Sequence, residues 1–486
     1  MMMRAALWVF AGKLGNQVIT LGIVMILARL LTPQDFGVVA ASQVILTLSQ
    51  VVVRFGIGAY LIQAEALTPR IVGTAQTLML TVALLISVIL FSFAGPIGDA
   101  INVPELVQIM PILLASFMLS AAINPSASLL SRDMDFKFLA QTEISSQAIG
   151  YGGVAVALAA LGFGFWALIL GTLAQTLMRA VLVFWRMPVW PNHSMTMSEI
   201  KPMLRFGGGV FLAQLMSNTA QRVDNLVITS VMGPAALGFY GRAYSLMEIS
   251  NKLIGSVFRE TLFSGFSKKR REGQGHGRDS MFLMAHAFAA FLILPIMALM
   301  WLLAEEIVWV ILGPKWDAAV PVLEILALGM YFRLGYKVSG TFILSEGAVY
   351  SLALRNLAYA VLVAAGALIG SRWGLPGVAW GVFGALVIHF VSMTTTALNF
   401  SGSQWRAYGK TASPFLIAGN LAWALAYGVQ KGLDEMPTLS ALAAAATFAA
   451  VYSAGLFITR RHHAVQVVAI RIAKSQWPNR TIRQVE

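Results

Sequence analysis

The sequence predicts an all-α protein that crosses a membrane about fourteen times. Of its 486 residues, 58% are hydrophobic and only 11% are charged, whereas soluble domains carry roughly a quarter charged residues. Apolar runs of ~20 residues recur from one end of the chain to the other, and a helix of that length spans the hydrocarbon core of a bilayer. The composition therefore excludes an ordinary water-soluble enzyme.

Polar breaks divide the apolar sequence into fourteen expected spans. Several breaks join a glycine or threonine to a proline, a combination that ends helices, as at Thr32-Pro33, Gly95-Pro96, Gly233-Pro234 and Gly313-Pro314. The expected spans cover residues 7–31, 36–63, 71–96, 106–131, 139–161, 164–186, 204–231, 236–265, 281–312, 318–344, 350–371, 375–399, 413–430 and 438–459. Most loops between them are short, which leaves no room for a separate catalytic domain.

The first apolar segment has some features of a signal peptide, because Arg4 precedes six apolar residues. Lys13 interrupts the apolar stretch, however, and no small-residue cleavage site precedes a polar region. We therefore expect this segment to be retained as the first span.

Basic residues indicate the orientation of the chain in the membrane. With the N-terminus in the cytoplasm, the inner loops and tails hold 20 Lys and Arg residues, against three outside, Lys315, Arg372 and Lys431. Both termini are therefore predicted to lie in the cytoplasm. The basic residues punctuate the apolar runs instead of forming one domain. The net charge of +13 thus points to anionic membrane lipids and not to nucleic acid.

A weak internal repeat relates the two halves of the chain at an offset of 201 residues. Arg4, Val9, Phe10, Leu14, Pro33 and Gly37 recur as Arg205, Val210, Phe211, Leu215, Pro234 and Gly238. Six expected spans separate the copies, which is an even number. Both halves therefore cross the membrane in the same direction and form a parallel repeat.

Polar side chains form stripes at matching places in the two halves. The stripes comprise Lys13, Asn16, Gln17 and Thr20; Gln43, Thr47, Gln50 and Arg54; Gln214, Ser217, Asn218 and Gln221; and Tyr244, Glu248 and Asn251. Single buried amides commonly hydrogen-bond between spanning helices, whereas these stripes continue over two or three turns. We therefore favour a hydrated central cavity over helix–helix bonding alone.

The expected cavity is cationic. Its basic candidates are Lys13, Arg54, Arg222, Lys252, Arg333 and Lys337, and the acids expected to lie deep are Asp224, Glu248 and Glu324. Glu248 and Lys252 form an i, i+4 pair of opposite sign, whereas Arg333 and Lys337 place two like charges on one helix face. The like-charged pair requires either an acidic side chain or a bound anion opposite it. Phosphate is the anionic substrate group that these cations would suit best.

No motif in the sequence specifies catalysis. The absence of cysteine excludes disulfides and a thiol nucleophile. Gly409-Lys410-Thr411 resembles the end of a phosphate-binding loop, but Gln404 occupies the place of the leading glycine. Asp133 and Asp135 have the form of a metal-binding pair, although a solvated helix cap is the favoured interpretation, and the six histidines show no ligand spacing. The sequence therefore predicts a protein that is not an enzyme and holds no metal or cofactor.

Residues 27–37, LARLLTPQDFG, resemble the first-hairpin signature of the Wzx-type polysaccharide flippases, which belong to the multidrug/oligosaccharidyl-lipid/polysaccharide exporter superfamily. Residues 224–228, 233–238 and 242–246 resemble its counterpart in the second half, and residues 132–140, 164–168 and 313–316 are also similar. The resemblance covers residues 4–400 and is specific as a set.

The resemblance implies two six-helix bundles around a central cavity, followed by two further helices. On this basis we expect an N-terminal bundle over 1–186, a cytoplasmic linker over 187–203 and a C-terminal bundle over 204–400. Two additional spans would occupy 401–459, and a basic cytoplasmic tail 460–486. The implied activity is alternating access that moves undecaprenyl-pyrophosphate-linked oligosaccharide units from the inner to the outer leaflet.

The implied substrate fits the polar stripes, which supply the site assignments. The expected substrate-binding residues are Lys13, Gln17, Gln50, Arg54, Gln214, Asn218, Arg222, Tyr244, Lys252, Arg333 and Lys337. Asp224 and Glu248 are the candidates for coupling to H+ or Na+. The expected partners are the lipid-linked oligosaccharide, anionic inner-membrane lipids, and a polysaccharide polymerase with its export machinery.

Other transport functions remain as alternatives at this stage. A drug/cation antiporter of the same superfamily would favour an acidic cavity, whereas the first expected span carries Lys13 and no acid in its middle. A peptidoglycan-precursor flippase would bind phosphate in the same way, and only the familial stretches argue against it. A membrane-embedded glycosyltransferase would normally need a large outer loop or a catalytic acid.

Overall fold

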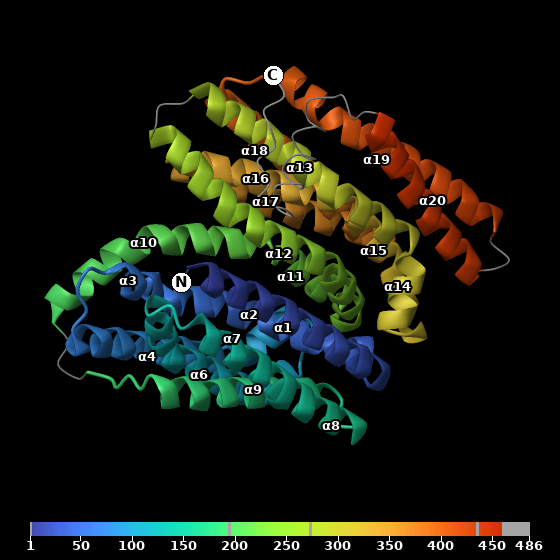
Figure 1. Ribbon diagram of the computed structural model, residues 1–486. Coiled ribbons are helices and arrows are strands. Elements are labelled where there is room, and N and C mark those ends of the chain that lie inside the picture. Colours follow the sequence, from blue (N-terminus) through green and yellow to red (C-terminus); the bar gives the residue numbers. More distant parts are fainter. Residues whose placement is uncertain (1, 193–195, 272–274, 434–436, 459–486) are drawn as a thin grey trace. The chain divides into compact units, whose positions relative to one another are not determined.

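The structure is a computed structural model that describes residues 2–192, 196–271, 275–433 and 437–458 (Figure 1). Within these ranges every regular element is a helix, which confirms the predicted all-α fold class. The helices of the first 232 residues are α1 (Met2–Leu30), α2 (Pro33–Arg54), α3 (Ile57–Gln63), α4 (Pro69–Ser92), α5 (Ala94–Ala100), α6 (Leu106–Arg132), α7 (Phe136–Ser145), the π-helix η1 (Ser146–Gly153), α8 (Val154–Ala160), α9 (Phe165–Arg186), α10 (Met197–Ala220) and α11 (Val223–Met232). The remaining helices are α12 (Pro234–Arg271), α13 (Gly275–Leu302), α14 (Ala304–Ile311), η2 (Pro314–Ala319), α15 (Val320–Leu328), α16 (Met330–Ser345), α17 (Val349–Gly370), η3 (Ser371–Trp373), α18 (Gly374–Ser401), α19 (Trp405–Gly432) and α20 (Pro437–Ile458). The expected tail, 460–486, lies outside the described residues.

Many of the helices are suited to crossing a bilayer. Among the described residues, eight helical segments are long and apolar enough, and a bent pair, Pro314–Leu328 with Met330–Ser345, makes a possible ninth. The protein is therefore a multi-pass membrane protein. One of the eight segments, Val349–Ser401, contains two of the expected spans. Other expected spans, such as 236–265 within α12, are not among the eight and mix charged side chains with apolar ones. The count of fourteen spans remains a prediction.

Three of the four helix breaks predicted at prolines coincide with helix boundaries in the structure. Thr32 begins α2 with a capping box, in which its hydroxyl accepts from the Asp35 amide and the Asp35 carboxylate accepts from the Thr32 amide. Gly233 and Gly313 have φ values of +84° and +98° before Pro234 and Pro314, a conformation that suits glycine. The break near Gly95-Pro96 was misplaced: α4 ends at Ser92, and Pro96 lies inside the first turn of α5, where a missing amide hydrogen breaks no bond.

The described chain divides into two compact units. The first comprises the described residues of Met1–Ala243, Val308–Ala319 and Asn356–Val382. The second comprises those of Tyr244–Ile307, Val320–Arg355 and Phe383–Glu486. This division follows contacts in space and interleaves segments of the chain, so the expected domain limits at 186, 203 and 400 remain predictions.

In the first unit, the start of α2 packs against the start of α12 through four residues that are equivalent in the repeat. A Cβ added to Gly37 would overlap the carbonyl oxygen of Pro234, and a Cβ added to Gly238 would overlap that of Pro33. Each glycine thus lets the other helix approach to backbone contact. We call these four residues the glycine seam. Its reciprocal pattern is that of an isologous contact.

A buried tryptophan supports the glycine seam. The Trp316 ring meets Phe36 of α2 and Phe239 of α12 edge-on, with centroids 5.4 and 5.8 Å away. Its indole Nε1 donates to the carbonyl oxygen of Ala28 at 3.0 Å, and Trp316 itself has no exposed surface. An aromatic side chain in this position fills the space around two closely packed backbones and satisfies its one polar atom.

In the second unit, α19 and α20 lie side by side and pack on α13 (Figure 1). The contact is built largely from alanine, with Ala298 of α13, Ala418 and Ala422 of α19, and Ala444 of α20 all buried. Small side chains let spanning helices approach closely. These are the two additional helices that the sequence predicted beyond residue 400.

Candidate functional site

The second unit contains a buried charged cluster formed by α12 and α16. The Arg333 Nη1 lies 3.7 Å from one carboxylate oxygen of Glu248, and the Lys337 Nζ lies 3.8 Å from the other. Arg333 also donates to the Tyr244 hydroxyl and lies over the Tyr244 ring, 4.9 Å from its centroid. The side chains of Arg333 and Glu248 are only 4% and 9% exposed, and that of Lys337 is 21% exposed. We call these four residues the charged cluster.

The charged cluster answers a question that the sequence left open. Arg333 and Lys337 need a negative group opposite them, and the structure supplies the Glu248 carboxylate from another helix. The sequence pointed to Lys252 as the partner of Glu248, but the Lys252 side chain lies outside the described residues. The sequence did contain a signal for this pairing. Tyr244 and Glu248 have the same four-residue spacing as Arg333 and Lys337, so the two pairs can face each other across two helices.

One turn beyond Glu248, the buried side chain of Asn251 is incompletely bonded. Its amide nitrogen contacts the Met247 sulfur at 3.2 Å, while its Oδ1 accepts no hydrogen bond within the described part of the chain. An acceptor buried without a donor costs about 1–3 kcal/mol. A hydroxyl group at this position would satisfy it.

The first unit holds a smaller polar hollow between α2 and α6. Arg54 Nη2 donates to Gln50 Oε1 at 3.4 Å, and both residues line a small open hollow with Ser120 and Asn124 of α6. The sequence predicted Gln50 and Arg54 and missed the two residues of α6. Ser116, Ser120 and Asn124 recur every fourth residue in the sequence, and this stripe was the available signal. The hollow combines one cation with amide and hydroxyl groups, which suits an anionic or sugar group.

Asp224, the other ion-coupling candidate, lies in the first unit at the start of α11. It is 3% exposed, and its carboxylate accepts from the Tyr240 hydroxyl at 2.8 Å and from the Asn225 amide at 2.9 Å. A carboxylate is stabilised at a helix N-terminus by the helix dipole. Arg222 is the half-buried N-cap of the same helix.

The other predicted site residues are only partly described. Gln17 on α1 and Asn218 on α10 are half-buried. The side chains of Lys13, Gln214 and Lys252 lie outside the described residues. The structure therefore joins four predicted residues in the charged cluster and two at the polar hollow.

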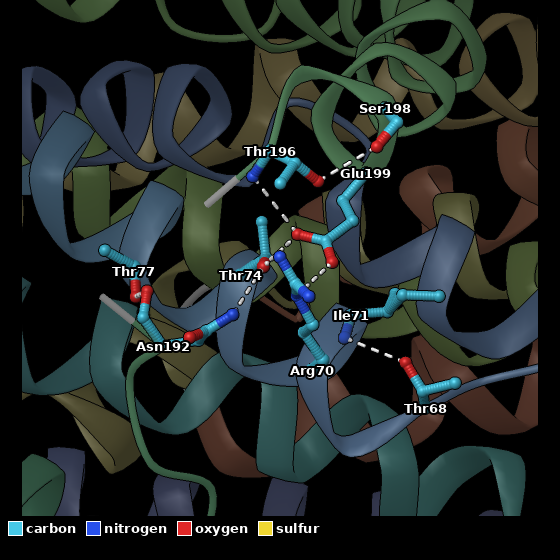
Figure 2. Close-up of polar contacts among 9 residues, drawn as sticks. All are labelled: Thr68, Arg70, Ile71, Thr74, Thr77, Asn192, Thr196, Ser198 and Glu199. Atoms are coloured by element: carbon cyan, nitrogen blue, oxygen red, sulfur yellow. Dashed lines mark hydrogen bonds and ion pairs between the residues drawn. The ribbon is translucent and has the colours of Figure 1, made fainter. Parts of the chain in front are cut away.

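A further polar cluster holds the segment that was predicted as the cytoplasmic linker (Figure 2). The Glu199 carboxylate pairs with Arg70 Nε at 2.7 Å and accepts from the Thr74 hydroxyl at 2.9 Å and the Thr196 amide at 3.3 Å. Asn192 donates from its backbone to the Gly73 carbonyl oxygen at 3.1 Å. Asn192 and Glu199, on either side of the undescribed residues 193–195, are thereby bonded to the first two turns of α4.

These contacts also set the ionisation of Glu199. Desolvation raises the pKa of this carboxyl, but hydrogen bonds from Thr74 and Thr196 and the charge of Arg70 outweigh it, so the pKa lies below its ordinary value. The carboxylate form is therefore favoured at neutral pH.

The family of the chain follows from comparison with known proteins. The family model described as "Polysaccharide biosynthesis protein" matches residues 26–321, which is more than half of the sequence. The chain belongs to this family. The match includes the hairpin stretch from residue 27 and its counterpart from residue 224, and the resemblance to Wzx-type flippases is confirmed.

Individual relatives agree with the family match. The chain is 25% identical to the succinoglycan biosynthesis transport protein ExoT of Rhizobium meliloti (strain 1021) over 411 residues, 84% of this chain and 80% of the relative. It is 23% identical over 402 residues to the lipopolysaccharide biosynthesis protein WzxC of Escherichia coli (strain K12), covering 80% of each chain. A solved structure of the lipid II flippase MurJ, in an inward closed conformation, has a similar fold, with a TM-score of 0.72, 12% identity and coverage of 92% of this chain and 99% of that one.

The polar groups of the two sites are mainly cations, amides and hydroxyls. Among the described residues, no three His, Asp or Glu side chains gather in a way that could hold a metal ion. Arg, Lys and Tyr side chains instead converge in the charged cluster, and Arg with amides at the polar hollow. Such groups recognise phosphate and sugar hydroxyls.

Proposed function

We propose that the protein is a flippase that moves undecaprenyl-pyrophosphate-linked oligosaccharide units across the bacterial inner membrane for exopolysaccharide, capsule or O-antigen synthesis. The observation that carries this proposal is the charged cluster, in which two cations and a tyrosine converge inside a multi-pass protein of the polysaccharide biosynthesis family. Two cations side by side suit a pyrophosphate, which presents several acceptor oxygens. Asn251, one turn from Glu248 in the same unit, has a buried acceptor oxygen that suits a sugar hydroxyl.

The proposal includes fourteen spans, arranged as two six-helix bundles related by a parallel repeat and followed by two further helices. The glycine seam supports the repeat, because the residues that meet there, Pro33 with Gly238 and Gly37 with Pro234, are equivalent at an offset of 201. Contacts between equivalent positions are expected about a two-fold axis. Both termini would then lie in the cytoplasm, as the distribution of basic residues predicts.

Transport would be driven by H+ or Na+ through Asp224 or Glu248, without a further cofactor and without a catalytic step. Both carboxylates are buried, and buried carboxylates inside a membrane protein commonly serve as ion sites. The partners would be the lipid-linked substrate, anionic inner-membrane lipids, and a polymerase with its export machinery.

Deletion of the gene tests the proposal. Surface polysaccharide would be scored together with the sidedness of accumulated lipid-linked oligosaccharide. Loss of polymer with the precursor trapped in the inner leaflet is the expected result. Normal polymer with altered sensitivity to cationic drugs would favour a drug/cation antiporter instead, and arrested cell-wall synthesis with normal polymer would favour a peptidoglycan-precursor flippase.

A further inference from the structure

The position of Glu248 in the charged cluster has the properties of a replaceable ligand. Its two carboxylate oxygens face two different cations, Arg333 and Lys337, at 3.7 and 3.8 Å. Charge-assisted hydrogen bonds are about 2.7–2.9 Å long. Glu248 therefore neutralises both cations, but these two contacts are longer than charge-assisted hydrogen bonds.

Arg333 is held by Tyr244 independently of Glu248. The Arg333 guanidinium lies against the Tyr244 ring and donates to its hydroxyl. Arg333 and Lys337 also share one face of α16, which is continuous from Met330 to Ser345. An anion that replaces Glu248 would thus find the Arg333 guanidinium already in place and Lys337 on the same helix face.

A buried site of this kind needs a negative group at all times. Removing the partner of a buried charge is strongly destabilising, because the remaining charge is left without compensation. A phosphate group has several oxygens that could approach both cations at hydrogen-bond distance, which the single carboxylate does not do here. Exchange of a carboxylate that contacts the two cations at 3.7 and 3.8 Å for a phosphate keeps the site neutralised and gains shorter bonds.

We propose that Glu248 is an internal counter-anion that occupies Arg333 and Lys337 when no substrate is bound and yields them to the diphosphate of the lipid-linked substrate. When the substrate leaves, the carboxylate returns to the two cations and restores the unoccupied site. Glu248 thus competes with the substrate for the two cations and does not itself bind the substrate. This inference rests on the proposed function for the identity of the ligand, but not for the exchange itself.

Binding of inorganic pyrophosphate to the full-length purified protein tests the exchange. Glu248→Gln removes the competing charge and keeps the shape, so it should bind pyrophosphate about tenfold tighter than the wild type, a difference of about 1.4 kcal/mol. Arg333→Ala with Lys337→Ala should lose binding. Glu306→Gln, at a half-buried carboxyl on α14 of the same unit, should match the wild type. Equal or weaker binding by Glu248→Gln would overturn the proposal.

Thermal unfolding supplies a second measurement. Glu248→Gln leaves the buried Arg333 and the partly buried Lys337 without this carboxylate, so it should unfold at a lower temperature than the wild type and gain more from added pyrophosphate. A residue with a merely structural role would lower stability without improving binding. If Glu248→Gln does not yield folded protein, Glu248→Asp carries the test, since its shorter side chain competes less well and should bind pyrophosphate more tightly than the wild type.

The two proposals fail in different ways. Undecaprenyl diphosphate in nanodiscs distinguishes a lipid diphosphate site from one that takes only free pyrophosphate. Tighter binding by Glu248→Gln, in a protein whose gene can be deleted without loss of surface polymer, would support the exchange and overturn the proposed function. Loss of polymer in the deletion strain, with binding unchanged in Glu248→Gln, would support the function and overturn the exchange.

Discussion

The glycine seam and the charged cluster bring helices together by opposite means. In the seam, Gly37 and Gly238 let two backbones touch, and the contact depends on shape alone. In the charged cluster, Glu248, Arg333 and Lys337 meet across 3.7–3.8 Å through charge. A contact that depends on shape tolerates no added atom, whereas one that depends on charge can exchange one anion for another. The first is suited to holding helices in one arrangement and the second to binding a ligand.

Removal of the cations should have the largest effect. We expect Arg333→Ala with Lys337→Ala to abolish polysaccharide export in a complementation assay, because no cation of the cluster would remain for the substrate. The structure adds that this variant removes both cations that contact the buried Glu248 carboxylate, which destabilises the protein.

A triple variant separates these two effects. Adding Glu248→Gln restores neutrality, so membrane levels of the protein should recover while export stays absent. Normal polymer output from either variant would contradict the assignment of the cluster to the substrate.

Closing the space in the glycine seam should have an intermediate effect. Gly238→Ala places a methyl group against the Pro33 carbonyl oxygen, and overpacking of this kind costs about 1–3 kcal/mol. Gly241→Ala is the matched control, because it lies on the same helix one turn away and an added Cβ there meets nothing within 4 Å. Thermal unfolding should show a lower midpoint for Gly238→Ala and not for Gly241→Ala. An equal midpoint for the two variants would refute the close contact.

Loss of the Glu199 charge should have the smallest effect, since Arg70 is largely exposed and exposed ion pairs contribute little. The folded-state pKa of Glu199 lies below its ordinary value, so its stabilising contribution is present at neutral pH and is lost as the pH falls through the folded-state pKa. Glu199→Gln should therefore lower the unfolding temperature slightly at pH 7, and the difference should shrink toward acid pH. A difference that persists unchanged at low pH would contradict this account. Unlike the charged cluster, this ion pair should also weaken with added salt.

Much of the architecture could be predicted from individual segments. Hydropathy predicted a multi-pass helical protein because the length of an apolar run is a local property. Thr32, Pro33 and Asp35 predicted the start of α2, since all three act within one turn. Local reasoning was less accurate at Gly95-Pro96, because a proline is tolerated in the first turn of a helix as well as at a break.

The sequence by itself determined which residues are polar, which helix faces they share, and that cations outnumber acids in the expected cavity. It also carried the family stretches between residues 27 and 316. Only the tertiary structure decided that Glu248 faces Arg333 and Lys337, that Ser120 and Asn124 join Gln50 and Arg54, and that Gly37 meets Pro234. The physical reason is that helical periodicity fixes the face on which a side chain lies, whereas packing between helices far apart in the chain fixes what that face meets.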